Sequence, residues 1–167
     1  MAMATTLLGD NPVHTVGELP APGSHAPSYT LTGVDLVDFT SDSHAGSRVV
    51  LNIFPSIDTG VCAASVRRFN QLAAGLENTA VVCASADLPF ALRRFCGAEG
   101  IENVQVGSSF RSSFGTDYGV TMVDGGMRGL LARSVVVFDT EGTVLHTQLV
   151  DAIGHEPDYD AAVAALG

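Results

Sequence analysis

The pattern of hydrophobic and polar positions predicts two buried strands in the first half of the chain. Residues 49–54 (VVLNIF) and residues 79–85 (TAVVCAS) are runs of mostly apolar and β-branched residues. Such runs are typical of central strands that are covered on both faces. Residues 29–32 and 36–40, which the turn sequence GVD separates, predict a short hairpin or a pair of extended edges. The first 27 residues, with four prolines and three glycines, predict an extended, turn-rich entry.

A helix is predicted between the two buried strands, over residues 62–74. Val66, Phe69 and Leu72 recur at helical spacing on one face, and arginine, asparagine and glutamine side chains occupy the other. Gly75 is the expected stop signal.

A second helix is predicted from the sequence ADLPFALRRFCG and is expected to end at Gly97. Asp87 is the expected N-cap, Leu88 the start and Pro89 the proline of the first turn. This helix would carry Cys96 near its C-terminal end. Its apolar face consists of Leu88, Leu92 and Phe95.

The second half of the chain is less regular at first and then clearer. Residues 97–130 are rich in glycine and serine and predict one short strand and one short helix. Residues 134–150 predict a hairpin with a turn at Glu141-Gly142, and residues 156–167 predict a closing helix. An apolar cluster within the irregular segment consists of Phe110, Phe114 and Tyr118.

The order of these elements predicts an α/β, thioredoxin-like fold. Strands and helices alternate as β-α-β-α and then continue as β-β-α, which favours a central mixed sheet with helices on both faces. An N-terminal β-hairpin extension of the sheet is also expected. The length of 167 residues is that of one domain, so residues 1–167 are expected to fold as a single unit.

Composition and charge exclude several classes of function. The net charge of −10 opposes a nucleic-acid backbone, so no nucleic-acid partner is expected. No stretch approaches the length of apolar residues that a membrane span requires, and the N-terminus does not resemble a secretory signal. We therefore expect a cytoplasmic protein without a membrane partner. All eight basic residues are arginine, which excludes lysine chemistry such as a Schiff base.

The three cysteines, at positions 62, 83 and 96, do not have the spacing of a metal or redox motif. No C-x-x-C is present, which argues against a zinc knuckle and against a thioredoxin-type active site. The five histidines are scattered without ligand spacing. We expect neither a metal nor a cofactor, and the cysteines are interpreted as reactive or merely buried thiols.

Cys62 is the strongest candidate for chemistry because it opens a predicted helix directly after the loop PSIDTGV. The first turn of a helix offers unpaired backbone N–H groups and the positive end of the helix dipole, and both favour a thiolate. The alternative is that Cys62 is a small core residue.

Two motifs resemble a known family. The stretch LNIFPSIDTGVCAASVRRFNQL resembles the active-site segment of the bacterial thiol peroxidases, a branch of the atypical two-cysteine peroxiredoxins. ADLPFALRRFCGAEG resembles the second cysteine segment of the same family. Further similarity lies in DYGVTMVDGGMRGLLARSVVVFD and QLVDAIGHEPDYDAAVAALG, so the resemblance covers nearly the whole chain.

The resemblance implies a thioredoxin-dependent peroxidase. In this reading Cys62 attacks a hydroperoxide and becomes a sulfenic acid, and Cys96 condenses with it to form an intramolecular disulfide that thioredoxin reduces. Pro55, Thr59 and Arg133 complete the peroxidatic site. The family is also typically homodimeric and favours organic over inorganic hydroperoxides. Apolar residues near the motif that are compatible with such a substrate are Phe54, Ile57, Val61 and Leu130.

Each of these roles has a structural alternative. Cys83 lies inside an apolar strand and should be inert, which favours Cys96 as the second thiol, although Cys96 is alternatively a packing residue at a helix end. Thr59 is alternatively a helix cap, and Arg133 a surface ion-pair partner. Because the two thiols lie on different helices, disulfide formation requires helix ends to unravel, and we expect a mobile segment at residues 95–100.

Two other classes of function would use the same residues. One is a redox-sensing binding protein whose disulfide switches a partner surface, and the rate of reaction with peroxide distinguishes it from an enzyme. The other is a non-catalytic thioredoxin-fold module. The presence of Thr59 and Arg133 beside both cysteines argues against this last class.

Overall fold

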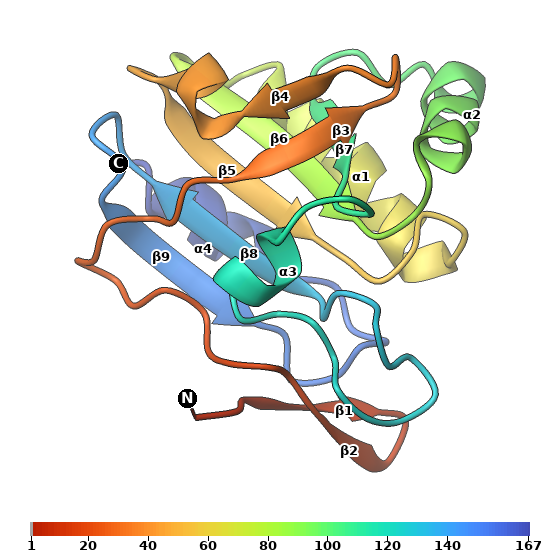
Figure 1. Ribbon diagram of the computed structural model, residues 1–167. Helices are drawn as coiled ribbons and strands as arrows, with labels where there is room; N and C mark the ends of the chain where they lie inside the picture. The colour runs from red at the N-terminus through yellow and green to blue at the C-terminus, as the bar shows by residue number, and fades with distance from the viewer. Residues whose placement is uncertain (1) are drawn as a thin grey trace.

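The protein is built around one seven-stranded mixed sheet (Figure 1). The computed structural model describes residues 2–167. The strand order in the sheet is β4-β3-β7-β6-β5-β8-β9, and β1 and β2 form a separate two-stranded sheet. The strands are β1 (Thr5–Leu8), β2 (Asn11–His14), β3 (Thr30–Gly33), β4 (Asp38–Thr40), β5 (Arg48–Ile53), β6 (Thr79–Ser85), β7 (Gln105–Ser108), β8 (Ser134–Phe138) and β9 (Val144–Leu149). The helices are η1 (Ser41–His44), α1 (Gly60–Ala73), α2 (Pro89–Glu99), α3 (Phe114–Asp117) and α4 (Tyr159–Ala164).

The two predicted buried strands lie side by side at the centre of the sheet. β5 and β6 pair in parallel, with Val49 opposite Ala80 and Asn52 opposite Cys83. On its other edge β5 pairs antiparallel with β8. Both edges of β5 are therefore occupied, and its apolar run is buried as the sequence predicts.

Alternate residues of β5 enter different cores, because successive side chains of a strand point to opposite faces. Val49, Leu51 and Ile53 pack in a cluster that includes Phe114 of α3. Val50 packs on the other face with Phe69 of α1 and residues of α4. In Figure 1, α3 lies in front of the sheet and α4 behind it. The predicted thioredoxin-like architecture with helices on both faces is confirmed.

Several boundaries differ from the prediction. α1 begins at Gly60 rather than residue 62, and α2 runs to Glu99 rather than ending at residue 97. The stop of α2 is Gly100, which adopts a left-handed conformation (φ 64°) that glycine tolerates without strain. The N-cap of α2 is Leu88 and not Asp87, whose carboxylate is engaged elsewhere. The short strand and helix expected within residues 97–130 are present as β7 and α3.

Three further findings concern the two N-terminal hairpins and the exposure of Phe110. The entry segment contains a real hairpin, β1–β2, where only extended chain was expected. The β3–β4 hairpin forms one edge of the main sheet, since β3 also pairs with β7. Phe110, expected in an aromatic cluster, is 44% exposed, whereas Phe114 and Tyr118 stack at 4.8 Å between ring centroids.

The β1–β2 hairpin is fastened to the chain that follows β9. The hydroxyl of Thr6 donates to the carbonyl of Val150 over 2.8 Å, and the amide of Ile153 donates to the carbonyl of Leu7 over 2.8 Å. The tip of the hairpin therefore lies near the start of α1. Leu8 and Gly9 of the tip border the same cavity as Gly60 and Val61 of the helix.

Candidate active site

Cys62 lies in the first turn of α1 and is fully buried. The helix has Thr59 as its N-cap, so Cys62 is the third helical residue. The apolar cluster around it includes Phe54, Val66 and Leu92. A thiol in this place meets the N-terminal end of a helix at one side and apolar side chains at the other, and bulk water is excluded.

Arg133 brings a positive charge to the sulfur of Cys62 from a distant part of the chain. Its Nη2 donates to Sγ of Cys62 over 3.2 Å, and its Nε donates to the carbonyl of Ile153 over 2.9 Å. Arg133 is only 2% exposed, so it is not a surface residue. Its Nη1 is buried without a hydrogen-bond partner among residues 2–167. A guanidinium held in this way offers one donor to the sulfur and has a second donor available.

Thr59 and Pro55 lie in the segment between β5 and α1, and both line the cavity described below. The hydroxyl of Thr59 donates to the carbonyl of Ser56 over 2.9 Å and makes no capping bond to α1. Thr59 therefore occupies the cap position through its backbone only, while its hydroxyl oxygen keeps lone pairs that can accept a hydrogen bond. Pro55 lies two residues after the end of β5 and is buried.

These residues border one cavity of about 240 Å³. Pro55, Thr59 and Arg133 line it, so three of the predicted site residues meet at one cavity, and Cys62 lies behind it in contact with Arg133. The remaining wall is largely apolar and comes from the tip of the β1–β2 hairpin, the start of α1 and two loops. Its residues are Leu8, Gly9, Gly60, Val61, Met127, Ile153 and Gly154.

Only part of the apolar set predicted for a substrate pocket borders this cavity. Val61 does, whereas Phe54 and Ile57 are buried in the cluster behind Cys62. Leu130 does not border the cavity and packs instead against a cluster of buried residues that includes Met122 and Ile153. The hairpin residues Leu8 and Gly9 were not foreseen, since nothing local in their sequence indicates which part of the fold they contact.

Cys83 is buried completely in the middle of β6, as expected. Burial raises the pKa of its thiol to about 12, which keeps the thiol protonated at neutral pH. Only the thiolate is nucleophilic, so burial disfavours any reaction at Cys83 in the folded protein.

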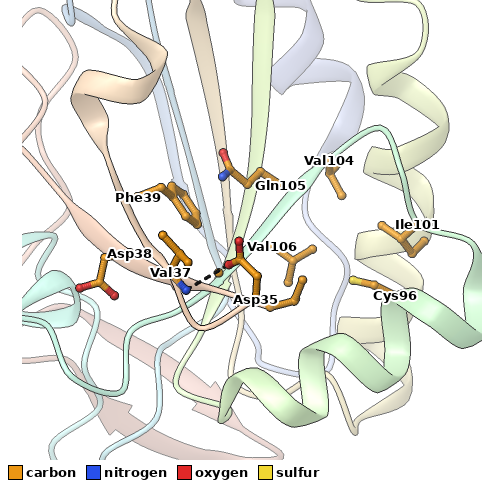
Figure 2. A pocket seen from close by; sticks show the side chains of 11 residues that line it. Asp35, Val37, Asp38, Phe39, Cys96, Ile101, Val104, Gln105 and Val106 are labelled. Atoms are coloured by element: carbon orange, nitrogen blue, oxygen red, sulfur yellow. Dashed lines mark hydrogen bonds between the residues drawn. The ribbon is translucent and has the colours of Figure 1, made fainter.

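Cys96 lies in the last turn of α2 and is half-buried. Burial raises the pKa of this thiol as well. Figure 2 shows the side chain at the edge of a second cavity, of about 330 Å³, between α2 and the β3–β4 hairpin. Apolar neighbours there are Ile101, Val104 and Val106. All three cysteines are free thiols, and Cys62 and Cys96 border the same apolar cluster from different helices.

Side-chain contacts hold the two cysteine helices together. Arg67 of α1 makes two hydrogen bonds to the carboxylate of Glu99, at 2.8 and 3.1 Å, and its guanidinium lies 5.5 Å from the ring centroid of Phe95. Arg94 of α2 pairs with Asp58 in the loop before α1. Cys96 cannot approach Cys62 by a helix-end movement without disturbing some of these contacts.

Sequence reasoning missed two polar networks that support the Cys62 segment. Asp87 accepts hydrogen bonds from Ser56 and Ile57 in the loop before Cys62. On the other side of Cys62, the buried Asn52 donates to the hydroxyl of Ser65 over 3.2 Å, and that hydroxyl donates to the carbonyl of Cys62 over 2.8 Å. One signal in the sequence could have indicated the role of Asp87, namely its place shortly after a predicted strand. The ends of neighbouring parallel strands meet at one edge of the sheet, so residues that follow them lie close together.

Among residues 2–167 no group of three or more His, Cys, Asp or Glu side chains has the arrangement of a metal site. In the same part of the chain, no helix is long and apolar enough to cross a membrane.

Comparison with known proteins gives consistent matches over the whole chain. The family model described as Redoxin matches residues 21–163. The chain is 59% identical over 165 residues to the thiol peroxidase of Mycobacterium tuberculosis, covering 99% of each protein. It is 56% identical over 164 residues to the thiol peroxidase of Corynebacterium glutamicum, covering 98% of this chain and 99% of the other.

A solved structure agrees with this relationship. The peroxiredoxin-like protein from Aquifex aeolicus matches with a TM-score of 0.92 and 39% sequence identity, over 98% of this chain and 96% of that chain. The chain therefore belongs to the redoxin family and, within it, to the bacterial thiol peroxidases, which are thiol-dependent peroxidases of thioredoxin-like fold.

Proposed function

We propose that this thiol peroxidase uses Cys62 as the peroxide-attacking thiolate and Arg133 as its electrostatic partner. The observation that carries the proposal is the 3.2 Å hydrogen bond from Nη2 of Arg133 to Sγ of Cys62 inside a buried site. A charge-assisted hydrogen bond of this kind stabilises the thiolate, which is the nucleophilic form.

The hydroperoxide enters the cavity that Pro55, Thr59 and Arg133 border. The free Nη1 of Arg133 donates to the peroxide, and the hydroxyl oxygen of Thr59 accepts from the peroxide O–H. The thiolate attacks the terminal oxygen, which keeps its hydrogen, and the O–O bond breaks with its electron pair on the leaving oxygen. That oxygen takes up one proton from water, which balances the proton that Cys62 released when it ionised. The products are the sulfenic acid of Cys62 and an alcohol, or water when the substrate is hydrogen peroxide. The largely apolar cavity wall favours organic hydroperoxides.

Cys96 then resolves the sulfenic acid. Its sulfur attacks the sulfur of Cys62, the thiol proton and the hydroxyl group leave together as water, and an intramolecular disulfide forms. Cys96 is the proposed partner because it lies nearer the surface than Cys83 and in a helix end that can open at Gly97 and Gly100. Thioredoxin is the proposed reductant, and its reducing power implies a cytoplasmic, reducing compartment. We also propose a homodimer.

The roles of the cysteines are tested by three serine variants in a thioredoxin-coupled assay with cumene hydroperoxide. Cys62→Ser should abolish peroxide consumption. Cys96→Ser should complete one stoichiometric turnover and then stall, because no thiol resolves the sulfenic acid. Cys83→Ser is the matched control and should cycle like the natural protein.

Mass spectrometry of the peroxide-treated protein should find a bridge between residues 62 and 96. Normal cycling of Cys96→Ser, or a bridge that includes Cys83, would show that the resolving role is assigned to the wrong residue. A protein that forms the disulfide but does not turn over with thioredoxin would instead be a redox-sensing binding protein.

A further inference from the structure

The carboxylate of Asp87 connects the end of β6 to the loop that leads to Cys62. One oxygen accepts from the hydroxyl of Ser56 over 2.7 Å. The other accepts from the backbone amide of Ile57 over 2.8 Å and from the hydroxyl of Ser85 over 2.6 Å. Ser56 and Ile57 belong to the loop between β5 and α1, whereas Ser85 ends β6. One half-buried side chain therefore ties the loop to a neighbouring strand.

Ser56 passes this restraint on to the start of α1. Its hydroxyl oxygen accepts from the amide of Asp58 over 3.2 Å. Its carbonyl accepts from both the hydroxyl and the amide of Thr59, over 2.9 and 3.2 Å. Thr59 is the N-cap of α1, three residues before Cys62. A continuous series of hydrogen bonds thus runs from Asp87 through Ser56 and Thr59 to the helix turn that carries the thiol.

Asp87 is itself held firmly. Its backbone carbonyl accepts a hydrogen bond from the hydroxyl of Ser108 at the end of β7. Its backbone amide donates to the hydroxyl oxygen of Ser85 over 3.3 Å. The amide of Ser109 donates to the carbonyl of Ser85 over 2.8 Å. The ends of two parallel strands therefore form a rigid base for the carboxylate, and α2 starts only two residues further on, at Pro89.

We propose that Asp87 is a positioning residue for the peroxide reaction, acting by holding the loop of residues 55–59 in the geometry that places Cys62 against Arg133, beside the cavity that Pro55, Thr59 and Arg133 line. The inference rests on Cys62 being the peroxide-attacking thiol. Asp87 exchanges no proton or electron with the substrate. Its carboxylate satisfies three donors at once, and no neighbouring side chain in these contacts offers a replacement acceptor of the same reach.

Loosening this loop should affect the rates of the two steps of the cycle differently. Peroxide attack needs the folded start of α1, because the Arg133 contact exists only there. Disulfide formation needs the cysteine segments to rearrange, because Cys62 is fully buried and Cys96 lies on another helix. A loosened loop should slow the first step and leave the second unchanged or faster.

The test compares Asp87→Ala with Asp87→Asn by the second-order rate constant for oxidation of Cys62 by cumene hydroperoxide. The alanine variant should react about 10- to 100-fold more slowly, which is the loss that a small misplacement of a reacting group produces. The asparagine variant should lose much less, since its amide oxygen still accepts from Ile57 and Ser85 and its amide nitrogen can donate to Ser56. The rate of disulfide formation, measured after the sulfenic acid has formed, should not fall in either variant.

Asp139→Ala is the matched control. The Asp139 carboxylate accepts from the amides of Glu141 and Thr143, each over 2.9 Å, in the β8–β9 turn, far along the chain from both cysteine segments. This control should lose stability without losing the rate of Cys62 oxidation. If Asp87→Ala does not fold, Ser56→Ala takes its place and should slow the oxidation by about threefold or more, since it removes one of the three bonds.

Three results would overturn the proposal. They are an Asp87→Ala protein that reacts within about threefold of the natural one, an equal loss in Asp139→Ala, and an equal loss in Asp87→Asn and Asp87→Ala. In the fallback case, an unchanged rate in folded Ser56→Ala has the same meaning. Peroxide consumption by Cys62→Ser would instead refute the proposed function, so the two failures are distinguishable.

Discussion

Replacing Arg133 with methionine should separate the electrostatic contribution of the guanidinium from its role in packing. Methionine is unbranched and apolar, so it can fill much of the buried space without leaving a charge. The change removes the 3.2 Å hydrogen bond from Nη2 to Sγ of Cys62 and the donor at Nη1. A hydrogen bond to a charged group contributes about 1.5 to 3 kcal/mol, and about 1.4 kcal/mol corresponds to a tenfold change in rate. The reaction of Cys62 with peroxide should therefore slow by about 10- to 100-fold.

The Arg133→Met rate is best measured in a Cys96→Ser background, where the sulfenic acid of Cys62 persists. Because the chain contains no tryptophan, chemical quenching followed by mass spectrometry is more suitable than intrinsic fluorescence. Arg128→Met is the matched control, since Arg128 is an exposed arginine in the loop before β8, and it should react like the natural protein. A rate for Arg133→Met within about twofold of this control would refute the electrostatic role, provided that thermal unfolding shows a folded protein.

Three further outcomes follow from the structure. Burial raises the pKa of Cys83 to about 12, whereas in the unfolded chain this thiol ionises from about pH 8.5 upward. The free energy of unfolding of the reduced protein should therefore fall by up to about 1.4 kcal/mol per pH unit above that pH. Urea unfolding from pH 8 to 10 should show a smaller loss in Cys83→Ala, and an equal slope would contradict the assignment. Limited proteolysis should cut residues 95–100 faster in the oxidised than in the reduced protein, because the bridge requires the end of α2 to open, and equal rates would count against that opening. Gly119→Ala should destabilise the protein by about 1 to 3 kcal/mol, because Gly119 has a φ of 69° and an added Cβ would lie 2.3 Å from the carbonyl oxygen of Glu18. Gly97→Ala, which meets nothing within 4 Å, should instead be neutral or stabilising in the same measurement.

The features that the sequence predicted well depend on local patterns. The apolar runs that became β5 and β6 are buried because both faces of a central strand must be covered, and the helical period of Val66 and Phe69 places one face of α1 on the sheet. The position of Cys62 in the first turn of α1 was also readable, because a strand, a loop and a helix follow one another within a few residues.

The features that only the tertiary structure decided depend on contacts between distant segments. Arg133 lies 71 residues from Cys62, and its guanidinium reaches the sulfur because β5 and β8 pair antiparallel and bring their ends together. Asp87 matched the pattern of a helix cap, but the parallel pairing of β5 and β6 placed the Cys62 loop within reach of its carboxylate instead. Local sequence determines periodicity and turn preference, whereas hydrogen-bond partners across a sheet follow from strand order. The sequence alone therefore determined the fold class and the place of Cys62 at a helix start, and the packing of the chain decided which side chains surround and hold that thiol.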